Sequence, residues 1–157
     1  MRARVTKLFE FEAAHCLPGH IGPDGEPGKC SRPHGHSYKL EVTLYAPVVN
    51  EPGFDLPGFE CASDHGFVMD FYWLSRKVKE LIVDVYDHQD LNQLLPFRTT
   101  AELMAFYFMG LLLEGGLPIE RVRLYETRTG YAEIHVEDFD QIEFEGLRRG
   151  IPQYWGR

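Results

Sequence analysis

Two segments of alternating apolar and polar residues, 4–15 and 34–46, constrain the fold of this chain most strongly. Because successive side chains of a strand point to opposite faces, each segment predicts a β-strand with one apolar face. In both segments the histidines alternate in step with the apolar residues, so they are expected on the same face of the strand. The inward set comprises Val5, Phe9, Phe11, Ala13 and His15 in the first strand and His34, His36, Tyr38, Leu40, Val42 and Leu44 in the second.

The inward-facing histidines suggest a metal site. If the two strands pair antiparallel, His15 can meet His34 and His36, which share a face at i, i+2 spacing. Three neutral imidazoles leave a fourth tetrahedral position open, which is the pattern of catalytic zinc sites. The alternative is that these are three core histidines with ordinary hydrogen-bond partners.

Cys30 lies four residues before His34, near the end of a Pro- and Gly-rich loop over residues 17–33. As a fourth ligand its thiolate would close the site and make it structural. As a neighbour of the metal it would be a base or nucleophile with a lowered pKa. The spacing alone leaves both roles open.

The middle of the chain predicts two helices. Asp70 opens the first, whose apolar residues recur at helical spacing until the chain reaches Asp87 and His88. Thr99 or Thr100 caps the second, and from Thr99 the sequence Thr-Thr-Ala-Glu is a capping box. This second helix is apolar nearly all round, so we expect a subunit interface to cover part of it.

Two further strands, over residues 119–128 and 131–137, follow a helix end and meet at a tight turn. The order is therefore β-β-α-α-β-β, an α+β domain with an antiparallel sheet. We expect one domain over residues 1–157, with a core over 4–137 and a C-terminal extension over 138–157. Residues 47–66 are expected to form a long surface loop, and residues 146–157 a docking arm or a loosely ordered tail.

Two other groups are candidates for the chemistry. Asp87-His88 can orient a proton-transfer group, or simply complete a surface helix end where histidine suits the dipole. Glu126 falls on the apolar face of its strand, where a lone carboxylate is costly. It can receive a pair of N–H groups from a heterocyclic ligand, or it can form an ion pair with Arg123 or Arg128.

Composition excludes several classes of function. The chain has 157 residues and a formal net charge of -8, without a basic run that would neutralise nucleic-acid phosphates. It contains no apolar run of about 18 residues and no signal-peptide core after its basic N-terminus, so we expect a cytoplasmic protein without a membrane span. Three cysteines, Cys16, Cys30 and Cys61, argue against a disulfide framework.

The ordered set of motifs over residues 5–136 resembles the 6-pyruvoyltetrahydropterin synthase and 6-carboxytetrahydropterin synthase family. The motifs are Phe11-Glu12-Ala13-Ala14-His15, Cys30-x3-His34-Gly35-His36, Val68-Met69-Asp70-Phe71, Asp87-His88-x-x-Leu91-Asn92, Thr100-Ala101-Glu102 and Glu126-Thr127. The resemblance implies the tunnelling fold, a four-stranded antiparallel sheet with two helices on one face. It also implies homo-oligomers, trimers or hexamers, with active sites between subunits.

The same resemblance implies roles for individual residues. The zinc ligands would be His15, His34 and His36, and the catalytic base would be Cys30, with Asp87 and His88 as its partners in proton transfer. The carboxylate of Glu126 would hold the pterin ring, and Thr99, Thr100 and Thr127 are further candidate contacts.

The implied substrate is 7,8-dihydroneopterin triphosphate, a small-molecule pterin. The Cys-x3-His-x-His spacing is similar to that of the 6-carboxy branch, which releases acetaldehyde and triphosphate. The alternatives are the 6-pyruvoyl branch, which eliminates triphosphate only, and a structural zinc-binding module with Cys30 as a ligand. The chain departs from the family at Thr99, where proline is common, and in its long 47–66 loop.

Overall fold

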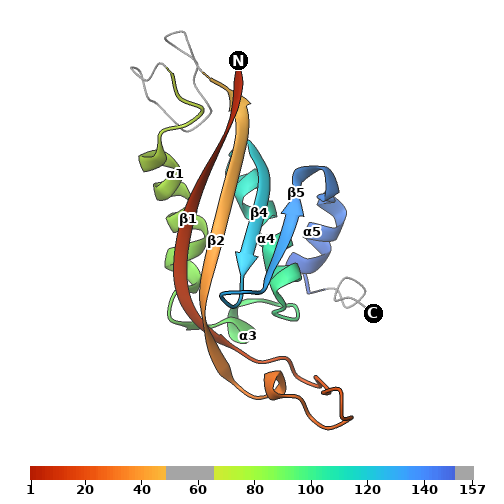
Figure 1. Ribbon diagram of the computed structural model, residues 1–157. Coiled ribbons are helices and arrows are strands. Elements are labelled where there is room, and N and C mark those ends of the chain that lie inside the picture. The colour runs from red at the N-terminus through yellow and green to blue at the C-terminus, as the bar shows by residue number, and fades with distance from the viewer. Residues whose placement is uncertain (49–65, 151–157) are drawn as a thin grey trace.

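The computed structural model describes residues 1–48 and 66–150, which form a twisted sheet covered on one face by helices (Figure 1). Strands β1 (Arg2–His15) and β2 (His34–Pro47) are the long members of the sheet. Both run along the alternating segments, and their apolar residues face the helices. The predicted strands are confirmed, with ends that shift by one or two residues.

The sheet has the strand order β3-β1-β2-β4-β5. Strands β4 (Ile119–Tyr125) and β5 (Tyr131–His135) continue it antiparallel beside β2. The four-stranded antiparallel sheet is confirmed, but a fifth strand of two residues, β3 (Gln89–Asp90), is parallel to β1. It forms because the chain that leaves the first helix passes along the free edge of β1.

The first helix begins as predicted after Asp70, whose carboxylate accepts from the N–H of Tyr72. It runs through α1 (Phe71–Val78), a π-helical stretch (Lys79–Val83) and α2 (Asp84–Tyr86). A one-turn helix, α3 (Leu91–Leu94), follows β3. The main helix of the layer is α4 (Ala101–Glu114), and its cap is Thr100 rather than Thr99, because Thr100 accepts from the N–H of Leu103.

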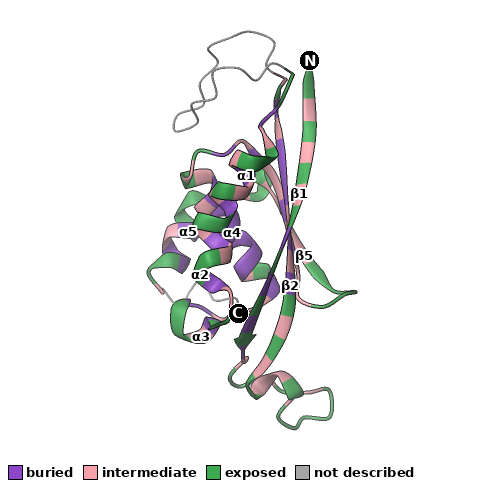
Figure 2. Cartoon of the chain, turned by 90° about the vertical axis from the view of Figure 1, so that its left-hand side faces the viewer, coloured by how far each residue is buried: buried purple, intermediate pink, exposed green. Residues whose placement is uncertain are grey.

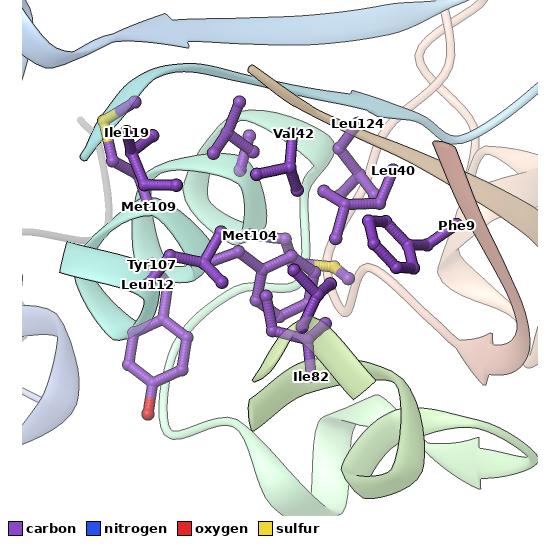
Figure 3. Packing of buried hydrophobic residues seen from close by; sticks show 14 of the residues in the cluster. Phe9, Leu40, Val42, Ile82, Met104, Tyr107, Met109, Leu112, Ile119 and Leu124 are labelled. Carbon is purple, nitrogen blue, oxygen red and sulfur yellow. The ribbon is translucent and has the colours of Figure 1, made fainter. Parts of the chain in front are cut away.

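The core lies between the sheet and this helical layer (Figures 2 and 3). Figure 3 shows Phe9, Leu40, Val42 and Leu124 of the sheet facing Met104 of α4. All five side chains are buried. No helix in the described part of the chain is long and apolar enough to cross a membrane.

The tail does not follow the sequence prediction. Residues Gln141–Arg148 form α5, capped by Asp140, and its Phe144 is fully buried against α4. A Cβ atom at Gly110 would lie 2.2 Å from the Phe144 ring, so the two helices need glycine to approach this closely. Residues 146–148 of the predicted tail are the end of this packed helix, so the loosely ordered alternative is wrong for them. The docking arm is untested, and residues 151–157 lie outside the described residues.

Helix α5 also removes the argument for a subunit interface on α4, which was the apolar surface of α4 on all sides. The apolar residues on the side of α4 away from the sheet are covered by α5 of the same chain, and Tyr107 packs its ring 5.6 Å from that of Phe144. An oligomer remains a prediction, but it no longer follows from this helix.

We expect Phe144→Ala to lower the free energy of unfolding by about 3–5 kcal/mol, because it leaves a cavity over Gly110. Chemical denaturation followed by circular dichroism measures this. Ile142→Ala is the matched control, since Ile142 lies on the same helix with 72% of its surface exposed. That change should stay within about 0.5 kcal/mol of the native value. Equal effects of the two changes would contradict the packing of α5 on α4.

Candidate metal centre

The pairing of β1 with β2 brings the three histidines together. His15 lies directly opposite His34, and His36 lies opposite Ala13 two positions along the same face. The ring centroids are 4.7 Å apart for His15 and His34, 5.0 Å for His15 and His36, and 4.8 Å for His34 and His36. The alternation of residues predicted this histidine cluster, and the antiparallel register of β1 and β2 forms it.

Hydrogen bonds do not satisfy the inward nitrogens of this cluster. The Nε2 atoms of His15, His34 and His36 are buried and form no hydrogen bond. Buried polar atoms normally form a hydrogen bond or bind an ion. Three buried Nε2 atoms without a hydrogen bond therefore indicate a site for a ligand. The alternative of three ordinarily bonded core histidines therefore does not fit.

The outward nitrogens of two rings are held by the backbone. His15 Nδ1 lies 2.9 Å from the carbonyl oxygen of Thr99, and His34 Nδ1 lies 2.8 Å from that of Arg32. Since a carbonyl only accepts, each Nδ1 carries the proton and donates it. The Nε2 lone pairs are then free to bind a cation, which is the support usual around metal-bound histidine.

Glu126 completes the group. One ligand atom from each of His15, His34, His36 and Glu126 lies within 4.8 Å of all the others, so these residues can hold a metal ion. The Glu126 Oε1 atom is 3.0 Å from His36 Nε2 and 3.4 Å from His15 Nε2, without hydrogen-bond alignment. The donor set fits a small cation of the zinc type.

The protonation states of the group suit a cation. Burial lowers the pKa of His36, which favours the neutral imidazole that binds metals. The His15 side chain, with help from the charges of His36 and His34, lowers the pKa of Glu126 despite its partial burial. Neutral imidazoles beside an ionised carboxylate are the forms that a metal ion requires.

An ion pair between Glu126 and arginine is not observed among the described residues. Arg123 instead binds Glu133, with Nε 2.6 Å from Oε2, and lies 3.4 Å from the carboxylate of Glu41. Glu126 follows β4 in a turn, where its N–H donates to the carbonyl of Gly130. The carboxylate is thereby directed into the histidine cluster.

Cys30 lies in a single 3₁₀ turn, Lys29–Ser31, and is half-buried with a free thiol. Its carbonyl accepts from the N–H of Leu17 at 2.6 Å, which ties the end of the loop to its start. Within the part of the chain described, Cys30 is not among the residues whose ligand atoms cluster with the histidines. The described structure therefore does not place the Cys30 thiol among the candidate metal ligands.

Asp87 and His88 form a pair at the edge of β1. The Asp87 carboxylate lies 2.9 Å from His88 Nδ1 and also accepts from the N–H of Glu12 at 2.9 Å. These contacts, first the backbone hydrogen bond from Glu12 and then His88, lower the pKa of Asp87. His88 has the left-handed φ of 57° and an N–H that donates to Glu12, so its exposed ring is held by the backbone.

A cavity of about 440 Å³ adjoins this pair. Its lining includes His88, Asp90, Glu12, Ser37 and the metal-site residue His36. The side chain of His88 is 75% exposed, so the ring projects outward and not into the buried histidine cluster of its own chain. The structure thus separates the Asp-His pair from the group of ligand atoms.

The three threonines have different surroundings. Thr99 is fully buried, and its carbonyl and hydroxyl both contact His15 Nδ1, so it supports a ligand from behind. Thr100 caps α4, and the exposed Thr127 accepts from the N–H of Gly130 at 3.0 Å.

Tyr38 is a residue of the site that the sequence interpretation treated only as core. Its ring stacks on Phe11 at 5.1 Å and lies edge-on to His36 at 5.6 Å, with 1% of its surface exposed. Its hydroxyl is buried without a hydrogen-bond partner. Burial, and then the negative charge of Glu126, raises the pKa of Tyr38. The sequence did contain a sign of this role, because the phenol of Tyr38 lies two residues beyond His36 and therefore on the same inward face of the strand.

The family assignment agrees with this geometry. A sequence profile described as 6-pyruvoyl tetrahydropterin synthase matches residues 4–137. The chain belongs to this family. The predicted resemblance is therefore confirmed, and so is the fold.

Curated relatives in this family carry two names. The 6-carboxy-5,6,7,8-tetrahydropterin synthase of Haemophilus influenzae is 33% identical, with 83% of this chain and 96% of the relative covered. The 6-pyruvoyl tetrahydrobiopterin synthase of Pongo abelii is 31% identical, with 80% and 86% covered. The solved 6-pyruvoyl tetrahydropterin synthase of Caenorhabditis elegans shares the fold, with a TM-score of 0.63, 22% identity, and coverage of 86% and 96%.

We expect His34→Ala to reduce bound metal from about one ion per chain to nearly none, because it removes one of three imidazole ligands. Elemental analysis by mass spectrometry after gel filtration measures the content. His135→Ala is the matched control, since His135 lies on β5 and contacts Glu133. Cys30→Ala should also keep its metal, and its loss there would mean that the thiol is a ligand.

Proposed function

We propose that this protein is a zinc-dependent lyase that converts 7,8-dihydroneopterin triphosphate and water to 6-carboxy-5,6,7,8-tetrahydropterin, acetaldehyde and triphosphate. The observation that carries the proposal is the cluster of three buried imidazoles whose Nε2 atoms form no hydrogen bond and lie beside the carboxylate of Glu126 or one another. Three such donors hold a metal and leave a coordination position open for a substrate. Family membership supplies the pterin class of substrate.

His15, His34 and His36 would hold the zinc ion. Bound there, zinc supplies a Lewis acid that polarises side-chain oxygens of the substrate and acidifies the neighbouring C–H bonds. The backbone carbonyls of Thr99 and Arg32 orient two of the imidazoles. Thr99 is in this proposal a support for His15, and the family's usual proline is absent at that position.

Cys30 acts as the base that removes or relays a proton of the substrate side chain. Its place in a short 3₁₀ turn after the loop leaves the thiol half-buried and unbonded to another cysteine. His88 handles the second proton, and Asp87 orients its ring through Nδ1. The left-handed backbone at His88 and its bond to Glu12 fix the direction of the imidazole.

Glu126 provides the substrate-binding carboxylate. Ionised and partly buried, it can accept two N–H groups from the pterin ring. Thr127 follows Glu126 directly in the chain, and Thr100 caps α4; both are assigned as further contacts.

The active sites are proposed to lie between subunits of a homo-oligomer, a trimer or a hexamer. The feature that supports this is the outward projection of His88, which is 75% exposed at the edge of the sheet. A histidine that serves proton transfer needs a substrate within hydrogen-bond reach. A neighbouring copy would bring its own metal cluster to that edge.

The second candidate is a 6-pyruvoyltetrahydropterin synthase, which the name of the Pongo abelii relative favours. The spacing Cys30-x3-His34 supports the carboxy branch, because the animal pyruvoyl enzymes resemble one another in a longer gap. A structural zinc module is a third reading, and it requires Cys30 as a ligand.

We expect the zinc-loaded protein to convert 7,8-dihydroneopterin triphosphate to a pterin that has lost two carbons of its side chain. Mass analysis of the pterin and an enzymatic assay for acetaldehyde measure this. A product that keeps all three side-chain carbons would identify the pyruvoyl reaction instead. Absence of any turnover with stoichiometric metal would favour the structural module.

Shared active sites predict complementation between two inactive variants. Cys30→Ala and His88→Ala should each lower kcat by about 10²–10⁴-fold, because each removes a proton-transfer group. Unfolding and refolding the two variants together should restore activity, since some sites then combine a native Cys30 with a native His88. Activity that stays at the level of the separate variants would place both residues in one chain's site.

A further inference from the structure

Tyr38 carries an unexplained hydroxyl at the metal cluster. The residue is 1% exposed, and its hydroxyl is buried without a hydrogen-bond partner in the described structure. Phenylalanine would fill the same space between Phe11 and His36 without a buried polar atom. Since an unsatisfied buried donor is costly, the hydroxyl points to a partner in another state of the site.

The surroundings of the phenol narrow the choice of partner. Phe11 offers only its ring, and His15 Nδ1 already donates to Thr99. The Nε2 atoms of the imidazoles are the proposed metal donors. The Tyr38 ring lies edge-on to His36 and His15, with ring centroids 5.6 Å and 6.2 Å away. Glu126 places its Oε1 atom against the Nε2 atoms of the same two imidazoles, so its carboxylate is the charged acceptor at this place.

Glu126 changes its surroundings when a metal arrives. In the structure its Oε1 atom lies against the Nε2 atoms of His36 and His15, at 3.0 Å and 3.4 Å. A cation held by those nitrogens leaves the carboxylate two choices, which are to become a fourth ligand or to turn away. A fourth anionic ligand would close the position that a catalytic zinc site keeps open.

We propose that Tyr38 is a positioning residue for Glu126. In the metal-loaded protein its hydroxyl donates to the Glu126 carboxylate and holds it off the metal, so that the fourth coordination position stays open and the carboxylate faces the substrate. An O–H donor to a carboxylate forms a strong, charge-assisted hydrogen bond. The inference rests on the proposed three-histidine metal site and not on which pterin reacts.

Cobalt(II) in place of zinc provides a test without any pterin. The visible spectrum of cobalt reports its coordination, and thiocyanate is a small anion that binds an open position. We expect thiocyanate to shift the spectrum of the native protein. In Tyr38→Phe the apparent thiocyanate affinity should fall by about tenfold or more, because the hydrogen bond that restrains Glu126 is lost.

Two further variants make the result specific. Tyr38→Phe combined with Glu126→Gln should recover native thiocyanate binding, since an amide is a poor metal ligand. Tyr45→Phe is the matched control on the same strand, because Tyr45 lies away from the cluster and contacts Arg2 and Arg4. It should match the native protein.

An unchanged thiocyanate affinity in Tyr38→Phe would overturn the proposal, and so would a loss that the added Glu126→Gln change does not restore. If Tyr38→Phe does not fold, the thiocyanate affinity of the single variant Glu126→Gln tests the proposal instead. Thiocyanate binding more than about tenfold tighter than native would then show that Tyr38 does not keep Glu126 off the metal, while native affinity would support the proposal. Failure of the native protein to turn over the pterin would bear only on the proposed reaction.

Discussion

The antiparallel register of β1 and β2 is the constraint on which the rest of the site depends. It sets His15 opposite His34 and places His36 two residues further along the same face. A slip of one residue would turn the imidazoles of one strand to the outer face, and the cluster would vanish together with half of the core. Core packing and the histidine cluster are therefore specified by one set of backbone hydrogen bonds. A single apolar face serves both purposes, because the histidines lie at its end.

The groups around the three imidazoles mainly hold two of these rings in place by hydrogen bonds to their outward nitrogens. Carbonyls of Thr99 and Arg32 hold the outward nitrogens of two imidazoles, and the turn after β4 directs Glu126 inward. The site consequently has three unpartnered Nε2 atoms, an ionised carboxylate and a buried phenol in one place. Such a concentration of polar atoms at the end of an apolar sheet is costly without a cation. The metal would therefore stabilise the fold as well as supply chemistry.

Much of this was accessible from the sequence. Parity predicted the inward faces of both long strands, helical spacing predicted the helix after Asp70, and the ordered motifs indicated the family. The failures share one cause. The coverage of α4 by α5 rests on the contact of Phe144 with Gly110, and strand β3 rests on its parallel pairing with Ala13 and Ala14 of β1. Both join segments more than 30 residues apart, which local patterns do not relate.

The sequence by itself determined which side chains are available: three histidines on the apolar faces of two strands, a cysteine four residues before His34, and a carboxylate at the end of a later strand. Only the tertiary structure decided their partners. It placed Glu126 against the imidazoles and not against Arg123, left Cys30 outside the group of ligand atoms, and buried the hydroxyl of Tyr38 without a partner. The physical reason is that periodicity specifies the face of a side chain. Distance and hydrogen-bond satisfaction are set only when strands, turns and helices pack together.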